Sequence, residues 1–574
     1  MRTKTSLRHV GTLVALLLAG TATGAHAQFS GDAGQGASEA PSVGSPAASE
    51  SGRDSRRGER RRSEKRVDVS PYLEVGQVLT ARLKGGDNDV LTYTTLAAGV
   101  GASIATRRAE LAASIRYEHR FGWSGGMQDD DILSGLVRGR LEAMRGLNLE
   151  GGALATRSSA DGRGANSGLF IGNSTNSANL YSLYAGPTFA RRIGGLDVGA
   201  GYRFGYTKVD VDTPAVLPPG VVERDLFDSS TNHVAWASVG QRPGDLPFGW
   251  QVSGGWERED ASQLDQRFEG KYVRGDVTVP VGPTLALLGG VGYEDVEISE
   301  RAPVVDTNGV PVRDAGGRFV TDPASPRLLS FDTDGLIWDA GVMWQPNRRT
   351  SLTAKVGRRY GDTIYTGSFT YRADHATTVV VGVYDGLSSF GRGLSGGLSA
   401  LPTQFDPTRN PISGDINPCV FGEQGGGCLG NQLGGGTTSA QFRNSGVQAT
   451  LSSRVRGWTY GVGVGYDRRR LLVPRTSPIA SLNGIVDENY YLFMTAGRQL
   501  DRDSDVAITG YLNYFDNGAP GAGDVQSAGL SAYYSRRFWR GLSGTAAASL
   551  NAFDQDGFNS ELIGSALVGL RYNF

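Results

Sequence analysis

Cysteine is the scarcest reactive residue type in this chain, and its two copies lie close together. Cys419 and Cys428 stand in a glycine-rich stretch with eight residues between them. A structural zinc site would require four ligands, and no histidine lies nearby. In an oxidising compartment such a pair favours a disulfide, with free thiols as the alternative. We therefore expect a disulfide between Cys419 and Cys428.

Two clusters of acidic residues are candidate calcium ligands, since calcium requires six or more oxygen atoms. One cluster is Asp129, Asp130 and Asp131; the other comprises Asp554, Asp556, Asn559 and Glu561. Neither spacing matches the helix-loop-helix calcium pattern. We interpret both clusters as polar hairpin tips and expect no metal and no cofactor.

Two motifs of common enzymes are missing from the sequence. It contains no His-Glu-x-x-His pair and no phosphate-binding loop. Hydrolases can use a serine together with a histidine. His119 is the candidate histidine here. We expect that the protein is not an enzyme.

The elements that must position these residues are strands, and the C-terminal one is the clearest. Leu570, Tyr572 and Phe574 continue an apolar stripe of alternate residues, whereas the intervening positions include Arg571 and Asn573. A period of two indicates a strand with one apolar face. An apolar outer face and a polar inner face are typical of the wall of a transmembrane barrel. The final aromatic residues are interpreted as a signature for outer-membrane assembly.

The same alternation recurs from residue 67 to residue 574, and the connections alternate in length. Short joints occur at residues 107–108, 144–146, 193–195, 281–283, 456–457 and 540–541. Longer polar joints occur at about 124–131, 159–177, 210–229, 299–327, 387–439 and 516–524. This asymmetry predicts an all-β, antiparallel transmembrane β-barrel of about 22 strands, within a range of roughly 18–22. The longest joint, 387–439, could fold inward as a constriction.

The N-terminal region is predicted to lie outside the barrel. Residues 1–27 have a basic start, a short apolar stretch and a small-x-small site formed by Ala25 and Ala27. This pattern is typical of a signal peptide, with the mature chain beginning at Gln28. Residues 28–66 are rich in Gly, Ser, Ala, Pro and Arg, so we expect a disordered basic periplasmic tail. The expected location is the outer membrane of a Gram-negative bacterium.

Charged residues recur on the parity that would face the lumen. These candidates are Arg116, Glu118, Arg138, Arg140, Arg203, Lys355, Arg359 and Arg571. Rings of basic residues can select anions, which would give a weak anion preference. The alternative is a ladder of cross-strand ion pairs that keeps the inner wall polar. The formal net charge of -1, with no basic stripe, argues against a nucleic-acid partner.

Local stretches carry a resemblance to known barrels. Residues 69–75 and 90–93, with the terminal Tyr572 and Phe574, resemble the β-barrel porins of Proteobacteria, and more particularly a barrel family common in sphingomonad-type bacteria. Some members are labelled as a preprotein-translocase accessory subunit, a short protein with one transmembrane helix. The chain lacks such a helix, so its sequence does not support that label.

The resemblance implies a function and partners. Relatives are often associated with exopolysaccharide export, so we expect a passive or export channel for polar solutes or polysaccharide. The expected partners are outer-membrane lipid and the outer-membrane assembly machinery. A structural or surface-interaction barrel with a blocked lumen is the alternative. An energised transporter is disfavoured, because only about forty residues separate the predicted cleavage site from the first strand, which is too few for a folded plug.

Overall fold

The computed structural model describes residues 66–85, 90–123, 129–162, 176–213, 224–314, 317–405, 407–422, 425–519 and 523–574. The predicted signal peptide, with Ala25, Ala27 and Gln28, lies outside the described residues. The predicted tail does too, except for Arg66, which begins the first strand.

Twenty-two strands form one antiparallel sheet. In its first half these are β1 (Arg66–Lys84), β2 (Val90–Ala105), β3 (Ala109–Gly122), β4 (Asp130–Met144), β5 (Leu147–Ser159), β6 (Ser177–Ile193), β7 (Leu196–Thr213), β8 (Ser229–Gln241), β9 (Gly249–Ala261), β10 (Gln266–Pro280) and β11 (Leu285–Glu300). In its second half they are β12 (Leu328–Asn347), β13 (Thr350–Arg359), β14 (Asp362–Arg372), β15 (Thr377–Ser388), β18 (Gln441–Val455), β19 (Trp458–Leu472), β20 (Val486–Gln499), β21 (Ser504–Asn517), β22 (Val525–Trp539), β23 (Leu542–Gln555) and β24 (Glu561–Asn573).

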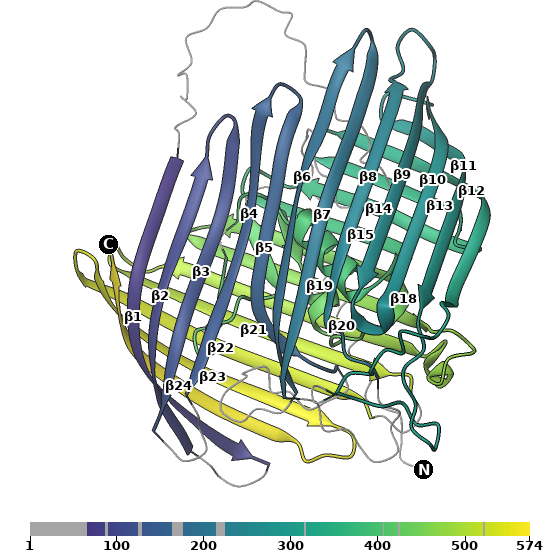
Figure 1. Cartoon of the computed structure of the whole chain (residues 1–574). Helices are drawn as coiled ribbons and strands as arrows, with labels where there is room; N and C mark the ends of the chain where they lie inside the picture. Colours follow the sequence, from purple (N-terminus) through teal and green to yellow (C-terminus); the bar gives the residue numbers. More distant parts are fainter. Residues whose placement is uncertain are drawn as a thin grey trace, which may run out of the picture.

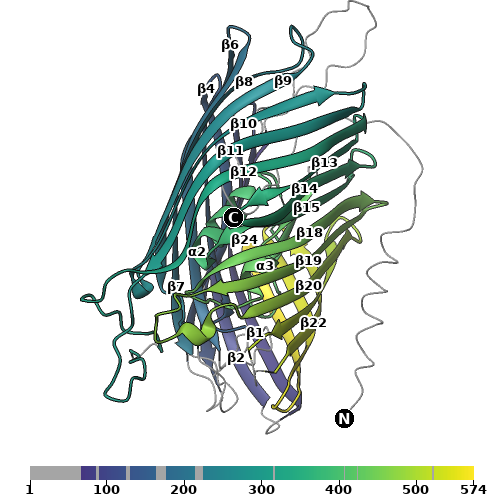
Figure 2. The ribbon, with the colours of Figure 1, turned by 90° about the vertical axis from the view of Figure 1, so that its right-hand side faces the viewer.

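The sheet closes on itself, because β1 pairs with both β2 and β24. Leu73 lies opposite Tyr572, and Val75 opposite Leu570. Closure gives the first and last strands a partner on both sides, which a strand-built membrane protein requires. The structure therefore confirms the predicted β-barrel and its strand number of 22. Figures 1 and 2 show the ring from two sides.

The connections differ in length at the two ends of the barrel. One end carries short turns, such as residues 106–108, 145–146 and 456–457; turns of this end lie along the upper edge of Figure 1. The other end carries residues 301–327 and 389–440. Outer-membrane barrels place short turns in the periplasm and long loops outside the cell. Both ends of the strand series, at β1 and β24, therefore lie on the periplasmic side.

The outer face is apolar and carries aromatic residues near the strand ends. On β24, Val568, Leu570 and Tyr572 are exposed, whereas Leu567, which directly precedes them, is buried. Near the periplasmic end, Trp344 and Trp539 are also exposed. An apolar band flanked by aromatic residues is the surface that a bilayer covers.

No helix among the described residues has the length and apolar character needed to cross a membrane.

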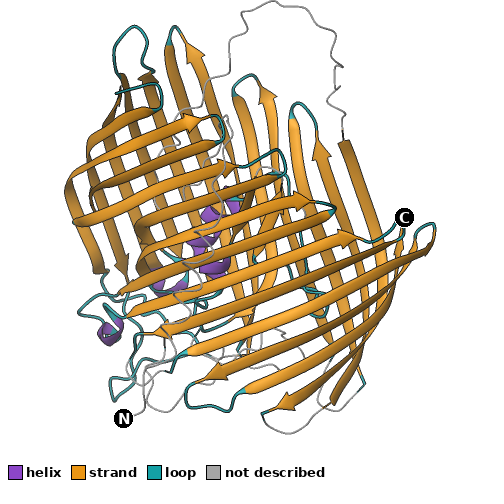
Figure 3. Ribbon diagram, turned by 180° about the vertical axis from the view of Figure 1, so that it is seen from behind, coloured by secondary structure: helices purple, strands orange, loops and turns teal. Residues whose placement is uncertain are grey.

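Between β15 and β18 the chain forms an inserted segment, residues 389–440, called here the lumen segment. It contains α2 (Phe390–Ala400), the two-stranded sheet of β16 (Cys419–Gly422) and β17 (Gly425–Cys428), and the short helix α3 (Gly430–Leu433). Short 3-10 turns, η1 (Gln263–Asp265) and η2 (Ala480–Leu482), lie in extracellular connections. Figure 3 shows the helices enclosed by the strands.

The inner face is not polar throughout, in contrast to the simple alternation expected from the sequence. Leu136, Leu154 and Leu180 on β4, β5 and β6 face inward and are buried. They pack against Leu394 and Leu398 of α2. The wall is apolar there because another part of the same chain covers it.

Candidate functional site: the segment inside the barrel

The lumen segment crosses the interior of the barrel and contacts the wall on several sides. Helix α2 packs against β5, β6, β7 and β8, while β17 packs against β15, β18 and β19. Ile412 joins a third group of wall residues with Val78, Tyr93 and Leu567. A segment that contacts the wall on several sides occupies part of the lumen.

The sequence of α2 explains its position. The Ser389 hydroxyl caps the helix by accepting a hydrogen bond from the Arg392 backbone N–H, at 3.1 Å. Phe390, Leu394 and Leu398 recur every four residues and form one buried apolar stripe. At Gly391 an added Cβ would lie 2.0 Å from the Ser230 hydroxyl, so only glycine allows this close approach to the wall.

Acidic wall residues lie at the N-terminal end of α2. The Ser389 hydroxyl donates to Glu259 at 2.6 Å. The Arg392 guanidinium lies 3.4 Å from Glu259 and 3.7 Å from Glu257, and it covers the Phe268 ring at 3.5 Å. All three charged side chains are buried. Negative charge at a helix N-terminus interacts favourably with the helix dipole.

Basic wall residues lie at the C-terminal end of α2. Arg138 donates to the carbonyl oxygens of Ser399, at 3.0 Å, and of Leu401, at 3.3 Å. Arg203 donates to the Ser399 hydroxyl at 2.7 Å. The Arg138 donors satisfy carbonyl groups that a helix end leaves unpaired. The wall is therefore electrostatically complementary to both ends of α2.

Substituting Arg392 tests how strongly this helix is held. In Arg392→Ala, Glu259 would remain buried without its counter-charge, which costs about 3–5 kcal/mol. We expect added protease to cleave the lumen segment far faster than in the native protein. The matched control is Arg140→Ala, because Arg140 is exposed and its side chain donates to Asn148. Equal cleavage of both variants would mean that the ion pairs do not hold α2.

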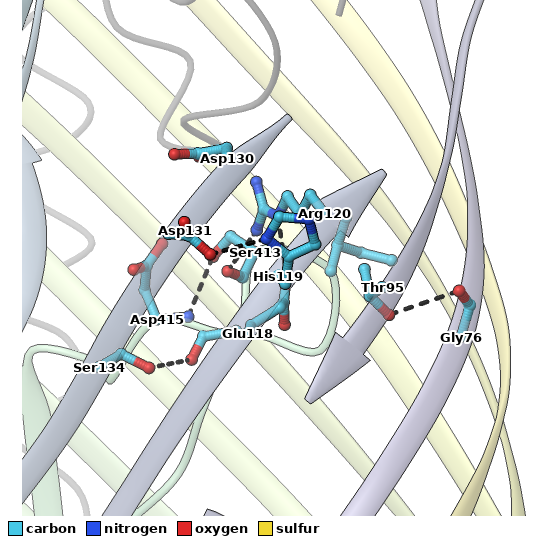
Figure 4. A network of polar contacts seen from close by, with 12 residues as sticks. Gly76, Thr95, Glu118, His119, Arg120, Asp130, Asp131, Ser134, Ser413 and Asp415 are labelled. Carbon is cyan, nitrogen blue, oxygen red and sulfur yellow. Dashed lines mark hydrogen bonds and ion pairs between the residues drawn. The ribbon is translucent and has the colours of Figure 1, made fainter. Parts of the chain in front are cut away.

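A second attachment holds the middle of the lumen segment to β3, β4 and β5 (Figure 4). Arg157 on β5 makes a bidentate ion pair with Asp415, at 2.8 and 3.1 Å. Arg120 on β3 donates to the Ser413 carbonyl at 2.8 Å, and Ser134 on β4 donates to the Gly414 carbonyl at 3.0 Å. Bidentate arginine–carboxylate pairs are among the stronger polar contacts in proteins. This attachment fixes residues 413–415 to the wall.

The eight charged residues predicted from the sequence to line the lumen all lie on inward-facing positions, where they have partners. Arg116 pairs with Glu74 and Glu118, Arg138 with Glu150, Lys355 with Asp339, and Arg359 with Glu294. Arg203 and Arg140 make the hydrogen bonds described above, and Arg571 covers the Tyr72 ring at 3.6 Å. Most of these cations are thus neutralised nearby. The arrangement favours the ion-pair ladder over an anion-selective ring.

The two cysteines form a disulfide that joins β16 to β17 inside the barrel. Both cysteines are fully buried. Beside them the Phe421 ring stacks on Phe493 of β20, with centroids 6.3 Å apart. The disulfide therefore stabilises the part of the lumen segment that faces β18, β19 and β20.

The extracellular mouth holds the C-terminal end of the lumen segment. Asp225 accepts hydrogen bonds from the Phe319 backbone N–H at 2.8 Å and from the Ser439 hydroxyl at 3.1 Å. Three segments thus meet at the Asp225 carboxylate: residues 224–228, the connection that contains Phe319, and the end of the lumen segment. Burial raises the pKa of Asp225 to about 6, although these hydrogen bonds and the charge of Arg313 act in the opposite direction.

This raised pKa predicts a pH dependence of the mouth. A carboxyl whose pKa is higher in the folded state stabilises that state fully below its ordinary pKa, and the contribution is lost as the pH rises through about 6. We expect protease cleavage near Ser439 to increase from pH 4.5 to pH 7.5. In Asp225→Asn the increase should be smaller, since the amide does not titrate. An unchanged pH profile in that variant would exclude Asp225 as its source.

The remaining candidates lie elsewhere. Leu570, Tyr572 and Phe574 are exposed at the end of β24. His119 lies on the outer face, where its Nδ1 is 2.7 Å from Asp131 (Figure 4). Among the described residues, no group of three or more His, Cys, Asp or Glu side chains is placed to hold a metal ion.

Sequence reasoning missed Arg157, Arg392, Asp415 and Glu259, which hold the lumen segment. Arg392 and Asp415 lie in what reads as a long polar loop, and their partners are more than 100 residues away in the chain. The only available signal was that charged residues occur within a glycine-rich stretch.

Comparison with known proteins gives structural neighbours only. No protein-family model matches the chain, and no curated protein matches its sequence. Solved structures similar to it include the ferric-catecholate import receptor Fiu of E. coli, with 10% identity over 89% of this chain and 82% of that one, at a TM-score of 0.45. The FrpB iron transporter of Neisseria meningitidis has 9% identity over 88% of this chain and 81% of that one, at a TM-score of 0.40. The siderophore receptor PiuA of Acinetobacter baumannii has 9% identity over 88% of this chain and 82% of that one, at a TM-score of 0.39.

At this identity and TM-score, we assign no ligand to the chain from these neighbours. Its class follows from its own structure: a closed antiparallel ring, an apolar outer face with aromatic ends, and long connections at one end only. These features together belong to outer-membrane barrels of Gram-negative bacteria. The protein is a 22-stranded outer-membrane β-barrel whose lumen contains residues 389–440 of its own chain.

Proposed function

We propose that the protein is an outer-membrane channel for polar solutes that the lumen segment closes at rest. The observation that carries this proposal is the way in which the interior is filled. A barrel of 22 strands encloses far more space than its wall side chains can occupy. An inserted segment fills part of that space, and movement of this segment would open a path without changing the wall.

The inner wall supports a polar cargo. Ion pairs such as Arg274 with Asp276 and Asp339, and Arg359 with Glu294, line the β10–β13 side. Polar solutes can exchange hydrogen bonds with such a surface, whereas apolar solutes cannot. Export of an exopolysaccharide, suggested by the resemblance to porin-like relatives, would use the same kind of lumen.

A structural barrel with a permanently blocked lumen is the second candidate. The buried ion pairs of Arg157 and Arg392 and the Cys419–Cys428 disulfide favour it, because they hold the segment firmly.

Liposome swelling in neutral sugars of graded size separates the two candidates. We expect wild-type protein to admit small sugars slowly. A variant that lacks residues 389–440 provides the positive control for barrel insertion, and protein-free liposomes provide the background. Background swelling with the wild type, together with rapid swelling with the deletion variant, would contradict the channel and support the blocked barrel.

A further inference from the structure

The barrel wall has a gap at its extracellular end between β14 and β15. The two strands pair only from Gly367 opposite Val383 to Arg372 opposite Thr378. Beyond this ladder, β14 continues to Asp362 along β13, and β15 continues to Ser388 along β18. The extracellular parts of β14 and β15 therefore have different partners and do not pair with each other.

A cleft of about 200 Å³ lies at this gap. Its apolar lining comes from Phe331 on β12, Leu387 on β15, Leu472 on β19 and Tyr360 in the β13–β14 turn. These four belong to one hydrophobic cluster, in which Phe331 and Leu472 remain partly exposed. The cleft thus presents apolar surface at the end of the wall where the membrane meets the outside.

Arg443, Arg470 and Asp362 form the charged side of the cleft. Arg443 is held by Asp385, at 3.0 and 3.1 Å, and by Asp362, and it donates to the Thr363 carbonyl at 3.0 Å. Arg470 is exposed and lies directly opposite Arg443 in the β18–β19 ladder. Within the described part of the chain, Arg470 has no acidic partner.

Like charges directly opposite each other on neighbouring strands destabilise the pair. The two carboxylates already neutralise Arg443 and fix its position, so the uncompensated charge is that of Arg470. An anion beside Arg470 would supply the missing counter-charge. Phosphate suits this role, because arginine binds it with two parallel hydrogen bonds.

We infer that this cleft binds a phosphate-bearing lipid of the outer leaflet, with its phosphate at Arg470 and the start of an acyl chain against Phe331, Leu387 and Leu472. The apolar lining distinguishes this ligand from a free phosphate ion, which would gain nothing from it. The place of the cleft, at the extracellular strand ends of a membrane barrel, is the level of lipid headgroups.

Native mass spectrometry of the delipidated full-length protein tests this inference, with lipid A, dephosphorylated lipid A and inorganic phosphate as probes. We expect lipid A to bind in one copy, and the other two probes to bind at least about tenfold more weakly, since one charge-assisted contact changes affinity by about that factor. Arg470→Ala should weaken lipid A binding by a similar factor. Arg470→Lys keeps the charge but not the paired hydrogen bonds. Its affinity for lipid A should lie between those of the native protein and Arg470→Ala.

Arg140→Ala is the matched control, because Arg140 is an exposed arginine near the periplasmic end of β4. Leu472→Ser should weaken lipid A binding as well. Equal binding of the dephosphorylated lipid, or unchanged lipid A binding in Arg470→Ala, would overturn the inference. Inorganic phosphate binding as tightly as lipid A would show an anion site without a lipid. None of these outcomes depends on conductance, so they are independent of the proposed channel function.

Discussion

Replacing residues 389–440 with a short Gly-Ser linker should convert the protein into an open pore with large, steady conductance steps in planar bilayers. The wall should tolerate this change, because Ser388 at the end of β15 already lies opposite Phe442 near the start of β18. Neighbouring strands are about 4.8 Å apart, so a hairpin loop of two to five residues joins them. The ring would keep all of its strand pairs.

Wild-type protein should show smaller or rarer steps under the same conditions. Heat-modifiable migration in gels checks that the deletion variant is a folded barrel. If the folded variant conducted no better than the wild type, the lumen segment would not be the obstruction.

Replacing Phe574 with glutamate should remove most of the protein from the outer membrane. Phe574 is 72% exposed, its ring meets Tyr572 edge-on at 5.1 Å, and its N–H donates to the Pro71 carbonyl. It thus stands at the seam where β24 joins β1. A charge on the lipid face near the membrane interface costs only about 0–1 kcal/mol. We expect a larger loss, because we interpret the terminal strand as the signal for assembly.

Trp539→Glu is the matched control for this substitution. Trp539 is 64% exposed at the periplasmic end of β22, but it is not at the end of the chain. Outer-membrane yield, measured by heat-modifiable migration, should fall much less in Trp539→Glu. Equal losses in the two variants would mean that lipid contact, and not the terminal position, explains the effect.

The wall of the barrel could be predicted from the sequence because its causes are local. Alternation such as that of Val568, Leu570 and Tyr572 depends only on which side of one strand meets lipid. The connections divide into short and long by composition alone. The ends of the strands were less predictable: β14 stops pairing with β15 at Gly367, where nothing in the local sequence changes character.

The interior could not be predicted in the same way, because its causes are contacts between distant residues. Leu136 and Leu154 interrupt the polar inner pattern for a reason that lies in α2, more than 200 residues later. The charge of Arg138 was visible in the sequence, but its role at the end of α2 depends on how residues 389–440 fold. The length of this segment suggested an inward fold as one option. The residues that attach it to the wall could be identified only from the structure.

A reversible tether between the lumen segment and the wall tests the central claim most directly. A Cβ built on Gly205 of β7 lies 3.1 Å from the Ser395 Cβ of α2, close to the spacing of about 3.8 Å found in disulfides. The measurement is sugar flux through Gly205→Cys/Ser395→Cys in liposomes, before and after addition of a reductant. The single variants and the native protein, treated identically, control for the Asn232 contact at Gly205 and for the native disulfide. We predict no flux while the tether is oxidised and restored flux once it is reduced; equal flux in both states would contradict closure of the channel by the lumen segment.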